Sequence, residues 1–135
     1  MPSIQAEQAI SLEEFILVLE KSKLSKRRPM QDLEFLGRMV SGANLWVTAR
    51  ENGELIGLMR GISDFCYRTF IADLAVNAPY QGQGIGSKLL LKTREIAPTA
   101  RLILFSAEDA EGFYQKLGFH LHERCYQLKT GEPMS

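Results

Sequence analysis

The sequence of 135 residues lacks the features that mark several classes of protein. It has only two cysteines, Cys66 and Cys125, which form no CxxC pair, and only two histidines, so we expect neither a disulfide framework nor a metal site. No apolar run is long enough to cross a membrane, so no membrane association is expected. Basic and acidic side chains number 16 each, and this balance argues against a nucleic-acid-binding protein, which is usually basic overall.

The composition that remains is typical of a globular protein. Hydrophobic residues make up 45% of the chain and charged residues 24%, which argues against disorder. The length suits one hydrophobic core, so we expect a single domain over residues 1–135. The N-terminal region has no secretion-signal pattern, which favours a soluble, cytoplasmic protein. The sequence leaves open whether the chain forms a homodimer.

The first part of the chain predicts a short edge strand followed by two helices. Apolar spacing predicts a helix from Ser11 to Leu24, and Ser11 with Glu14 has the spacing of a capping box. A second helix is expected to begin at Pro29, since proline is favoured in the first helical position, and to end at Gly42.

The rest of the chain predicts a sheet and further helices. Residues 44–76 contain three strand-like runs, the first two joined by Asn52-Gly53, so an antiparallel meander is expected. The elements expected after it are a helix to about Ala97, a strand "RLILF", a helix with Ala110, Phe113, Tyr114 and Leu117 on one face, and a last strand from Phe119 to about Leu128. This order predicts an α/β fold of the α+β type, with a mixed sheet and helices on both faces.

One stretch, "DLAVNAPYQGQGIGSKLLLK", indicates an anion site. A strand-like run ends near Pro79, three glycines follow at alternate positions (Gly82, Gly84 and Gly86), and a leucine-rich helical pattern begins. The first N–H groups of a helix have no partner within it, and glycines let a phosphate approach them closely. The spacing fits neither the GxGxxG dinucleotide fingerprint nor a P-loop. Glycines needed only for positive φ are the alternative interpretation.

Two separated motifs resemble the GNAT superfamily of N-acetyltransferases. The stretch "VNAPYQGQGIGSKLL" resembles the central motif of that family, and "FYQKLGF", from Phe113 to Phe119, resembles its second motif. The resemblance covers nearly the whole chain and implies a mostly antiparallel central sheet with a splayed strand pair and helices on both faces. It also implies acetyl-CoA as the cosubstrate, without a metal. The cofactor-binding residues that it implies are Leu74, Ala75 and Val76 for the pantetheine arm, and Gln81, Gly82, Gln83, Gly84, Ile85, Gly86 and Ser87 for the pyrophosphate.

The reaction implied is transfer of an acetyl group to a primary amine by direct attack, and a small molecule is the expected acceptor. The "SD" at Ser63-Asp64 and the run "QGQG" are similar to plant-type serotonin N-acetyltransferases and their bacterial relatives. A protein-lysine or peptide acetyltransferase is one alternative. A noncatalytic acyl-CoA-binding module is another, and Ala107, where many family members have asparagine, leaves room for it.

The resemblance also suggests catalytic residues. Tyr114 matches a tyrosine that is frequent in the family, and a phenol suits protonation of the departing thiolate. The alternative for Tyr114 is a core residue with its hydroxyl bonded to the backbone. Asp73 stands in the central strand where the family often has an acidic residue, and it is the candidate base, with Asp64, Glu108 or a water relay as alternatives. A structural ion pair explains Asp73 equally well.

The acceptor is expected to bind beside aromatic residues. Asp64, Phe65 and Tyr67 form the candidate substrate site, in which the carboxylate attracts the ammonium of the amine, and Trp46 is a further candidate. Aromatic residues in such positions more often serve ordinary packing.

Overall fold

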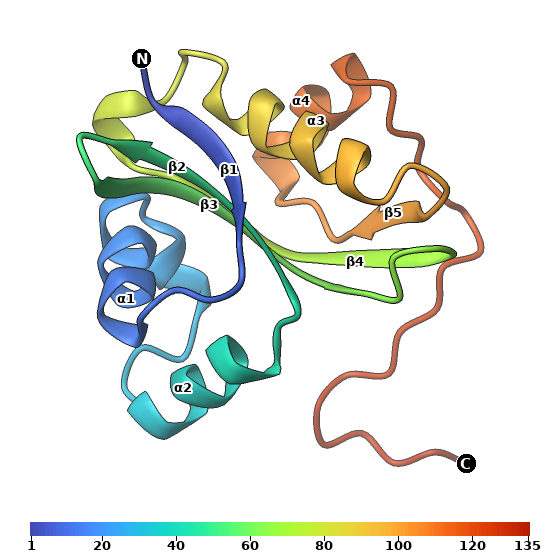
Figure 1. Ribbon diagram of the computed structural model, residues 1–135. Coiled ribbons are helices and arrows are strands. Elements are labelled where there is room, and N and C mark those ends of the chain that lie inside the picture. The colour runs from blue at the N-terminus through green and yellow to red at the C-terminus, as the bar shows by residue number, and fades with distance from the viewer. The chain divides into compact units, whose positions relative to one another are not determined.

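The computed structural model describes all 135 residues and consists of two compact units, Met1–Phe105 and Ser106–Ser135. The first unit holds a five-stranded sheet in the order β1-β2-β3-β4-β5, antiparallel except for the last pair (Figure 1). The strands are β1 (Ser3–Glu7), β2 (Leu45–Glu51), β3 (Glu54–Ser63), β4 (Arg68–Val76) and β5 (Arg101–Leu104). The helices of this unit are α1 (Leu12–Lys21), α2 (Leu33–Gly42) and α3 (Ile85–Ile96), with 3-10 turns η1 (Leu24–Arg27) and η2 (Ala78–Tyr80). The predicted mixed sheet is confirmed.

Helices cover both faces of the sheet in the first unit. Figure 1 shows α1 and α2 on one face and α3 on the other. The core under α1 centres on Phe15 and Trp46, whose rings meet edge to face with centroids 5.9 Å apart. Both side chains are buried, and so is Leu36 of α2. No helix combines the length and the apolarity needed to span a bilayer.

The three central strands form the predicted meander. Asn52 and Gly53 join β2 to β3 with φ values of 51° and 84°, and two positive values are what a tight type I′ hairpin turn needs. On β3, Gly57 lies in close contact with its surroundings. A Cβ atom at Gly57 would lie 3.2 Å from the Ala75 carbonyl oxygen and 3.5 Å from Cγ2 of Ile85. The first residue of α3 therefore packs directly on the backbone of the sheet.

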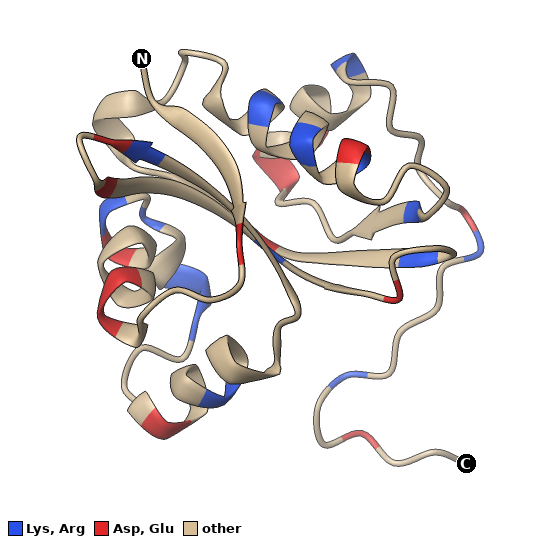
Figure 2. Cartoon of the chain, viewed as in Figure 1, with Lys and Arg blue, Asp and Glu red and all other residues tan.

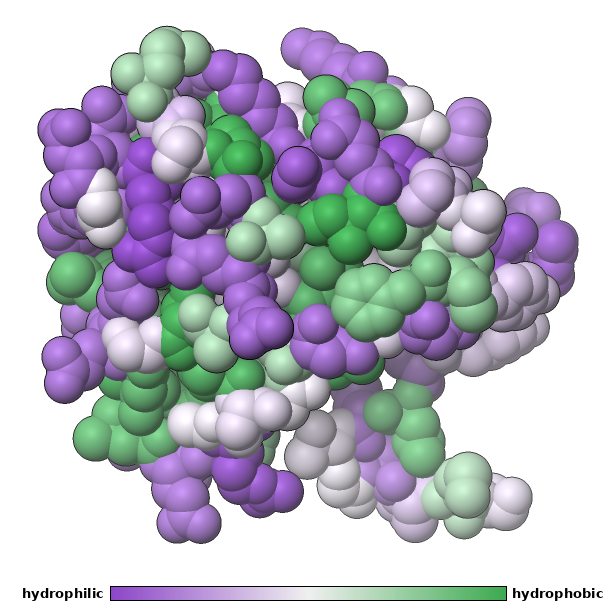
Figure 3. Space-filling model, in the orientation of Figure 1, coloured by the Kyte–Doolittle hydropathy of each residue, from purple (hydrophilic) through white to green (hydrophobic).

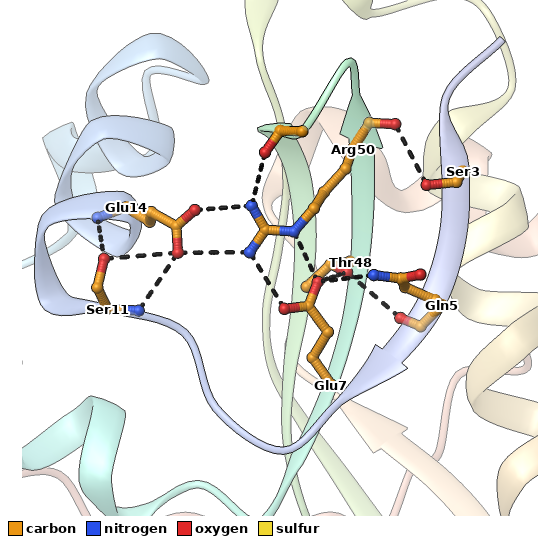
Figure 4. A network of polar contacts seen from close by, with 8 residues as sticks. Ser3, Gln5, Glu7, Ser11, Glu14, Thr48 and Arg50 are labelled. Atoms are coloured by element: carbon orange, nitrogen blue, oxygen red, sulfur yellow. Dashed lines mark hydrogen bonds and ion pairs between the residues drawn. The ribbon is translucent and has the colours of Figure 1, made fainter.

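An ion-pair network joins β1, α1 and β2. The Arg50 guanidinium lies between two carboxylates, with Nε 2.8 Å from Glu7 Oε2 and Nη1 2.7 Å from Glu14 Oε2 (Figure 4). The Glu7 carboxylate also accepts a hydrogen bond from Thr48. Hydrogen bonds from Arg50 lower the pKa of Glu7 to about 2 and also lower the pKa of Glu14. Glu14 completes the predicted capping box with Ser11, so the network also holds the start of α1.

The predicted start of the second helix is wrong by four residues, whereas its end at Gly42 is confirmed. The helix begins at Leu33, and the Asp32 side chain accepts the Phe35 N–H at 3.0 Å. Aspartate is among the preferred N-cap residues, and this cap decides the start of the helix in place of Pro29. Leu33 and Phe35 stay exposed, and green atoms appear in the region of α2 at the lower left of Figure 3.

The second unit contains η3 (Glu108–Ala110) and α4 (Glu111–Lys116). The expected last strand from Phe119 to Leu128 is wrong, because these residues pair with no strand. The physical reason lies in their alternation: the apolar positions Phe119 and Leu121 are odd-numbered, but Tyr126 and Leu128 are even-numbered. Such a change of phase directs the two halves of a strand to opposite faces.

Candidate cofactor and catalytic site

The glycine loop begins α3 with backbone that favours glycine. Gly82 and Gly84 have φ values of 81° and 80°, in the left-handed region that residues with a Cβ atom rarely adopt. A Cβ atom at either position would meet no atom within 4 Å. The two glycines therefore serve the chain conformation and also leave the space in front of the helix open. No acidic side chain lies in the first turn of α3.

Backbone donors are left free in this loop. The N–H groups on either side have acceptors: Gln81 donates to the Ala78 carbonyl at 3.2 Å and Lys88 to the Gly84 carbonyl at 3.1 Å. Between them lie six successive N–H groups that meet no protein acceptor. They belong to Gly82, Gln83, Gly84, Ile85, Gly86 and Ser87. Free donors at the positive end of a helix dipole are suited to binding an anion, and we call residues 82–87 the cradle.

Strand β4 has an open edge beside the cradle. It pairs with β5 only from Arg68 to Ile71, whereas its pairing with β3 continues to Val76. The predicted splayed strand pair is thereby confirmed. Asn77 donates its N–H to the Ile56 carbonyl on β3 at 2.8 Å, and alternation along the strand directs the main-chain groups of Leu74 and Val76 to the open edge. Ala75, by the same alternation, directs its groups to β3.

Side chains of the site link the open edge to the cradle. Gln81 donates from Nε2 to the Val76 carbonyl at 2.8 Å, so its side chain closes the turn between strand and helix. Asn77, at the end of β4, has a buried Oδ1 atom without a donor. An unpaired buried acceptor costs roughly 1–3 kcal/mol, so this oxygen is suited to a donor from a bound molecule. The sequence analysis did not identify Asn77; its only signal was its place at the end of the strand.

Asp73, on β4, lies between the guanidinium groups of Arg28 and Arg60. Its side chain has no exposed surface. Arg28 Nε donates to Oδ1 at 2.7 Å and Arg60 Nε donates to Oδ2, so a cation holds each carboxylate oxygen. Arg28 also donates to the Ala72 carbonyl at 3.2 Å, which ties the connection before α2 to this strand. The contacts are those of the structural ion pair, and the role of Asp73 as a base stays a prediction.

Tyr114 lies in the second unit within an aromatic cluster. Its ring meets Phe113 and Phe119 edge to face, with centroids 5.1 Å and 5.6 Å away. Within this unit its hydroxyl makes no hydrogen bond, so the backbone bond proposed as the alternative is not observed there. Burial raises the pKa of the Tyr114 phenol above its ordinary value.

The candidate substrate residues lie in the loop between β3 and β4. Asp64 Oδ1 accepts three backbone N–H groups, those of Cys66, Tyr67 and Arg68, at 2.7 to 3.0 Å, and these bonds lower the pKa of Asp64 to about 2. The carboxylate therefore closes the loop. Phe65 and Tyr67 are exposed, and their role in substrate binding stays a prediction.

Two observations bear on the acceptor site expected beside this loop. Tyr67 is six residues from Asp73 along β4, or about 20 Å in an extended strand. Trp46 is only 1% exposed and packs against Phe15, so the expectation that it receives the acceptor is wrong. Its position in a central strand next to α1 makes it a core residue.

Comparison with known proteins agrees with this geometry. Residues 12–119 match the model of the acetyltransferase (GNAT) family. The chain is 32% identical over 97 residues to glucosamine 6-phosphate N-acetyltransferase of Trypanosoma brucei brucei, with 68% of the chain and 58% of the relative covered. The chain thus spans little more than half of that relative.

Solved structures show the same fold. A GNAT family acetyltransferase from Streptococcus pneumoniae superposes with a TM-score of 0.78 at 25% identity, and 96% of each chain is covered. A PaiA N-acetyltransferase from Thermoplasma acidophilum, solved in complex with coenzyme A, superposes with a TM-score of 0.63 at 21% identity, covering 91% of this chain and 93% of that one. With the family match and the splayed sheet taken together, the chain belongs to the GNAT family of acetyltransferases.

Proposed function

We propose that this chain transfers the acetyl group of acetyl-CoA to a primary amine of a small molecule. The observation that carries the proposal is the cradle, six successive N–H groups without a protein acceptor, beside the open edge of β4. Had the protein's own carbonyls already satisfied these groups, no diphosphate could be held there. The free donors, the space in front of Gly82 and Gly84 and the absence of acidic side chains in the first turn of α3 all fit the diphosphate of coenzyme A.

The two parts of the site have different tasks in this proposal. Acetyl-CoA supplies an acetyl group activated as a thioester. The N–H groups of the cradle bind the diphosphate, and the main-chain groups of Leu74 together with the N–H of Val76 hold the pantetheine arm as an added strand would be held. The Val76 carbonyl already accepts a hydrogen bond from Gln81. An N–H at this open edge can also stabilise the negative charge that develops on the carbonyl oxygen during attack. The Asn77 Oδ1 atom accepts a hydrogen bond from an N–H of the bound arm.

The proton transfers need two further groups. Attack requires a neutral amine, because an ammonium has no lone pair, and the leaving thiolate must be protonated. We assign the second task to the phenol of Tyr114, whose pKa burial raises. For the first task, Asp73 is one candidate. Because two guanidinium groups already hold its carboxylate, removal of the proton by water is the alternative that its contacts favour.

Acetyl transfer is tested by thiol release from acetyl-CoA with a panel of acceptors. The panel contains an aromatic amine, a polyamine, an amino sugar phosphate and a lysine peptide. Amine-dependent release of coenzyme A together with a small acetylated product supports the proposal. Transfer to the lysine peptide alone supports the protein acetyltransferase instead. Tight coenzyme A binding without release on any acceptor indicates a noncatalytic acyl-CoA-binding module.

The acceptor is the finer part of the proposal. The "SD" and "QGQG" elements suggest serotonin as one aromatic amine for the panel, although none of the relatives named above carries that activity in its name. The trypanosome relative is named for glucosamine 6-phosphate, which is why an amino sugar phosphate belongs in the panel. Comparison of kcat/KM between these two acceptors decides between an aromatic and an anionic amine.

A further inference from the structure

A pocket of about 480 Å³ lies at the other end of α3 from the cradle. Its wall is formed by Tyr67 and Arg68, at the start of β4, and by Arg94 with residues 98–101, where α3 leads into β5. Arg94 is nine residues along α3 from Ile85, which is about 14 Å in a helix. We call this site the arginine pocket. It is distinct from the cradle.

The arginine pocket has three cations and no acidic lining residue. Arg68, Arg94 and Arg101 line it, and none of them forms an ion pair. Figure 2 shows the basic residues at the adjoining ends of β4 and β5. The nearby carboxylate of Asp64 is committed to the backbone of its own loop. In a chain with zero formal net charge, this local excess of positive charge requires an explanation.

Two of the cations stand directly opposite each other. Arg68 and Arg101 are register partners in the parallel pairing of β4 with β5. Like charges in directly opposed positions of a sheet repel each other and destabilise it. An anion placed between the two side chains would reverse the sign of that interaction. The pairing therefore points to a ligand with negative charge.

The hydrogen-bonding capacity of the pocket also favours an anion. Lining carbonyl groups are already in use: Arg94 Nη1 donates to Pro98 at 3.1 Å and to Ala100 at 2.7 Å, and the Tyr67 carbonyl accepts the Arg101 N–H at 2.9 Å. The Arg101 guanidinium, in contrast, has no partner, and Arg68 lies 3.9 Å from the Tyr67 ring centroid. The pocket thus offers the unpaired guanidinium of Arg101 beside those of Arg94 and Arg68, which contacts with lining carbonyls and the Tyr67 ring hold in place, and it has few free acceptors.

We propose that the arginine pocket binds the phosphate group of a small phosphorylated molecule. Guanidinium groups match phosphate oxygens in pairs, and a phosphate ester carries up to two negative charges for the three cations. The volume of the pocket is in the range of small-molecule sites. The pocket is open to solvent and confined to seven lining residues, so it does not provide the extended track that a nucleic acid needs. The exposed ring of Tyr67 is available to the organic part of the ligand.

The test is calorimetric titration of inorganic phosphate into the full chain at low ionic strength. The Gly84→Glu variant serves as the host, because it blocks the cradle whether or not acetyl transfer is confirmed. We expect saturable binding that weakens as salt is added. Arg101→Gln should weaken binding by at least about tenfold, as loss of a charged hydrogen-bonding partner does. Arg38→Gln on α2, which also removes an exposed arginine without an ion pair, should leave binding unchanged.

Thermal unfolding with and without phosphate distinguishes binding in the arginine pocket from a general effect of charge on stability. Phosphate should raise the Tm of the wild-type chain, whereas the Arg101→Gln chain, relieved of its opposed charges, should start at a higher Tm and respond less. Titrations with ADP and with glucose 6-phosphate then distinguish a nucleotide from a sugar phosphate. Absence of saturable binding overturns the proposal, as does equal weakening in Arg38→Gln. Tighter binding of a single-stranded RNA than of any small phosphate also overturns it.

Discussion

Replacement of Asp73 by asparagine separates the two roles that this residue could have. Asparagine has nearly the same shape but no charge, so Asp73→Asn leaves two guanidinium groups around a neutral amide. The Arg60 side chain is 10% exposed and that of Arg28 is 21% exposed, so neither is fully hydrated. Removal of one partner from a buried ion pair costs about 3–5 kcal/mol, and the partial exposure of Arg28 favours the lower end of that range.

We therefore expect Asp73→Asn to lower the free energy of unfolding by about 3 kcal/mol. Urea denaturation followed by circular dichroism measures this change. Turnover per folded molecule is measured on the same preparation, at a temperature where the variant is folded. A structural ion pair predicts less than a tenfold change in kcat, whereas loss of a general base predicts a fall of about 10²- to 10⁴-fold.

A double-mutant cycle makes the test specific to the contact. Arg28→Gln alone should also destabilise the chain, and the double variant Arg28→Gln/Asp73→Asn should lose less than the sum of the two single changes, because the Arg28–Asp73 contact can be lost only once. Arg60 loses its carboxylate partner in both Asp73→Asn chains, so its contribution cancels in the cycle. Unchanged stability in Asp73→Asn, combined with a collapse of kcat, would refute the ion-pair reasoning and establish the base. Additive losses in the cycle would show that the contact between these side chains contributes little.

Three further predictions address the cradle, the phenol and the fold. Gly84→Glu should abolish coenzyme A binding in calorimetry, whereas Gly131→Glu, which has a similar φ of 83°, should not; retained affinity in the folded Gly84 variant would contradict the cradle. Tyr114→Phe should lower kcat by about 10- to 1,000-fold and remove the loss of rate at alkaline pH, so an unchanged pH–rate profile would exclude the phenol. The network lowers the pKa of Glu7 from its ordinary value of 4.5 to about 2. Above pH 4.5 this carboxylate therefore adds about 3 kcal/mol to the free energy of unfolding, and this contribution is lost as the pH falls toward 2. Between pH 6 and pH 3, the free energy of unfolding should fall less for Glu7→Gln than for the wild-type chain. Equal falls in the two chains would contradict the network.

Sequence patterns predicted the parts of the fold that local chemistry controls. Asn52-Gly53 adopts positive φ at both positions, and Ser11 with Glu14 caps α1, because the side chains that determine these features are neighbours in the chain. The glycine loop was located for the same reason. The start of α2 was missed because Pro29 and Asp32 are both acceptable start signals, and only the structure shows which one caps the helix.

Features that depend on residues far apart in the sequence could not be predicted. Asp73 is 45 residues from Arg28, and no spacing rule places a guanidinium on it. A tryptophan such as Trp46 occurs both in cores and in binding pockets, so the sequence alone did not show that it is buried. The arginine pocket likewise depends on the register of β4 with β5, which places Arg68 opposite Arg101.

The close packing at Gly57 sets the distance between the cradle and the open edge of β4. Ile85 starts the helix that carries the cradle, and it lies against Gly57, the register partner of Val76 at the open edge. A methyl group at Gly57 would press first on the Ala75 carbonyl oxygen, 3.2 Å away, and would reach ordinary contact with Ile85 at 3.5 Å. The bare backbone at Gly57 thus lets β4 and the start of α3 lie together, and it sets the span that a cofactor bound as proposed would have to bridge.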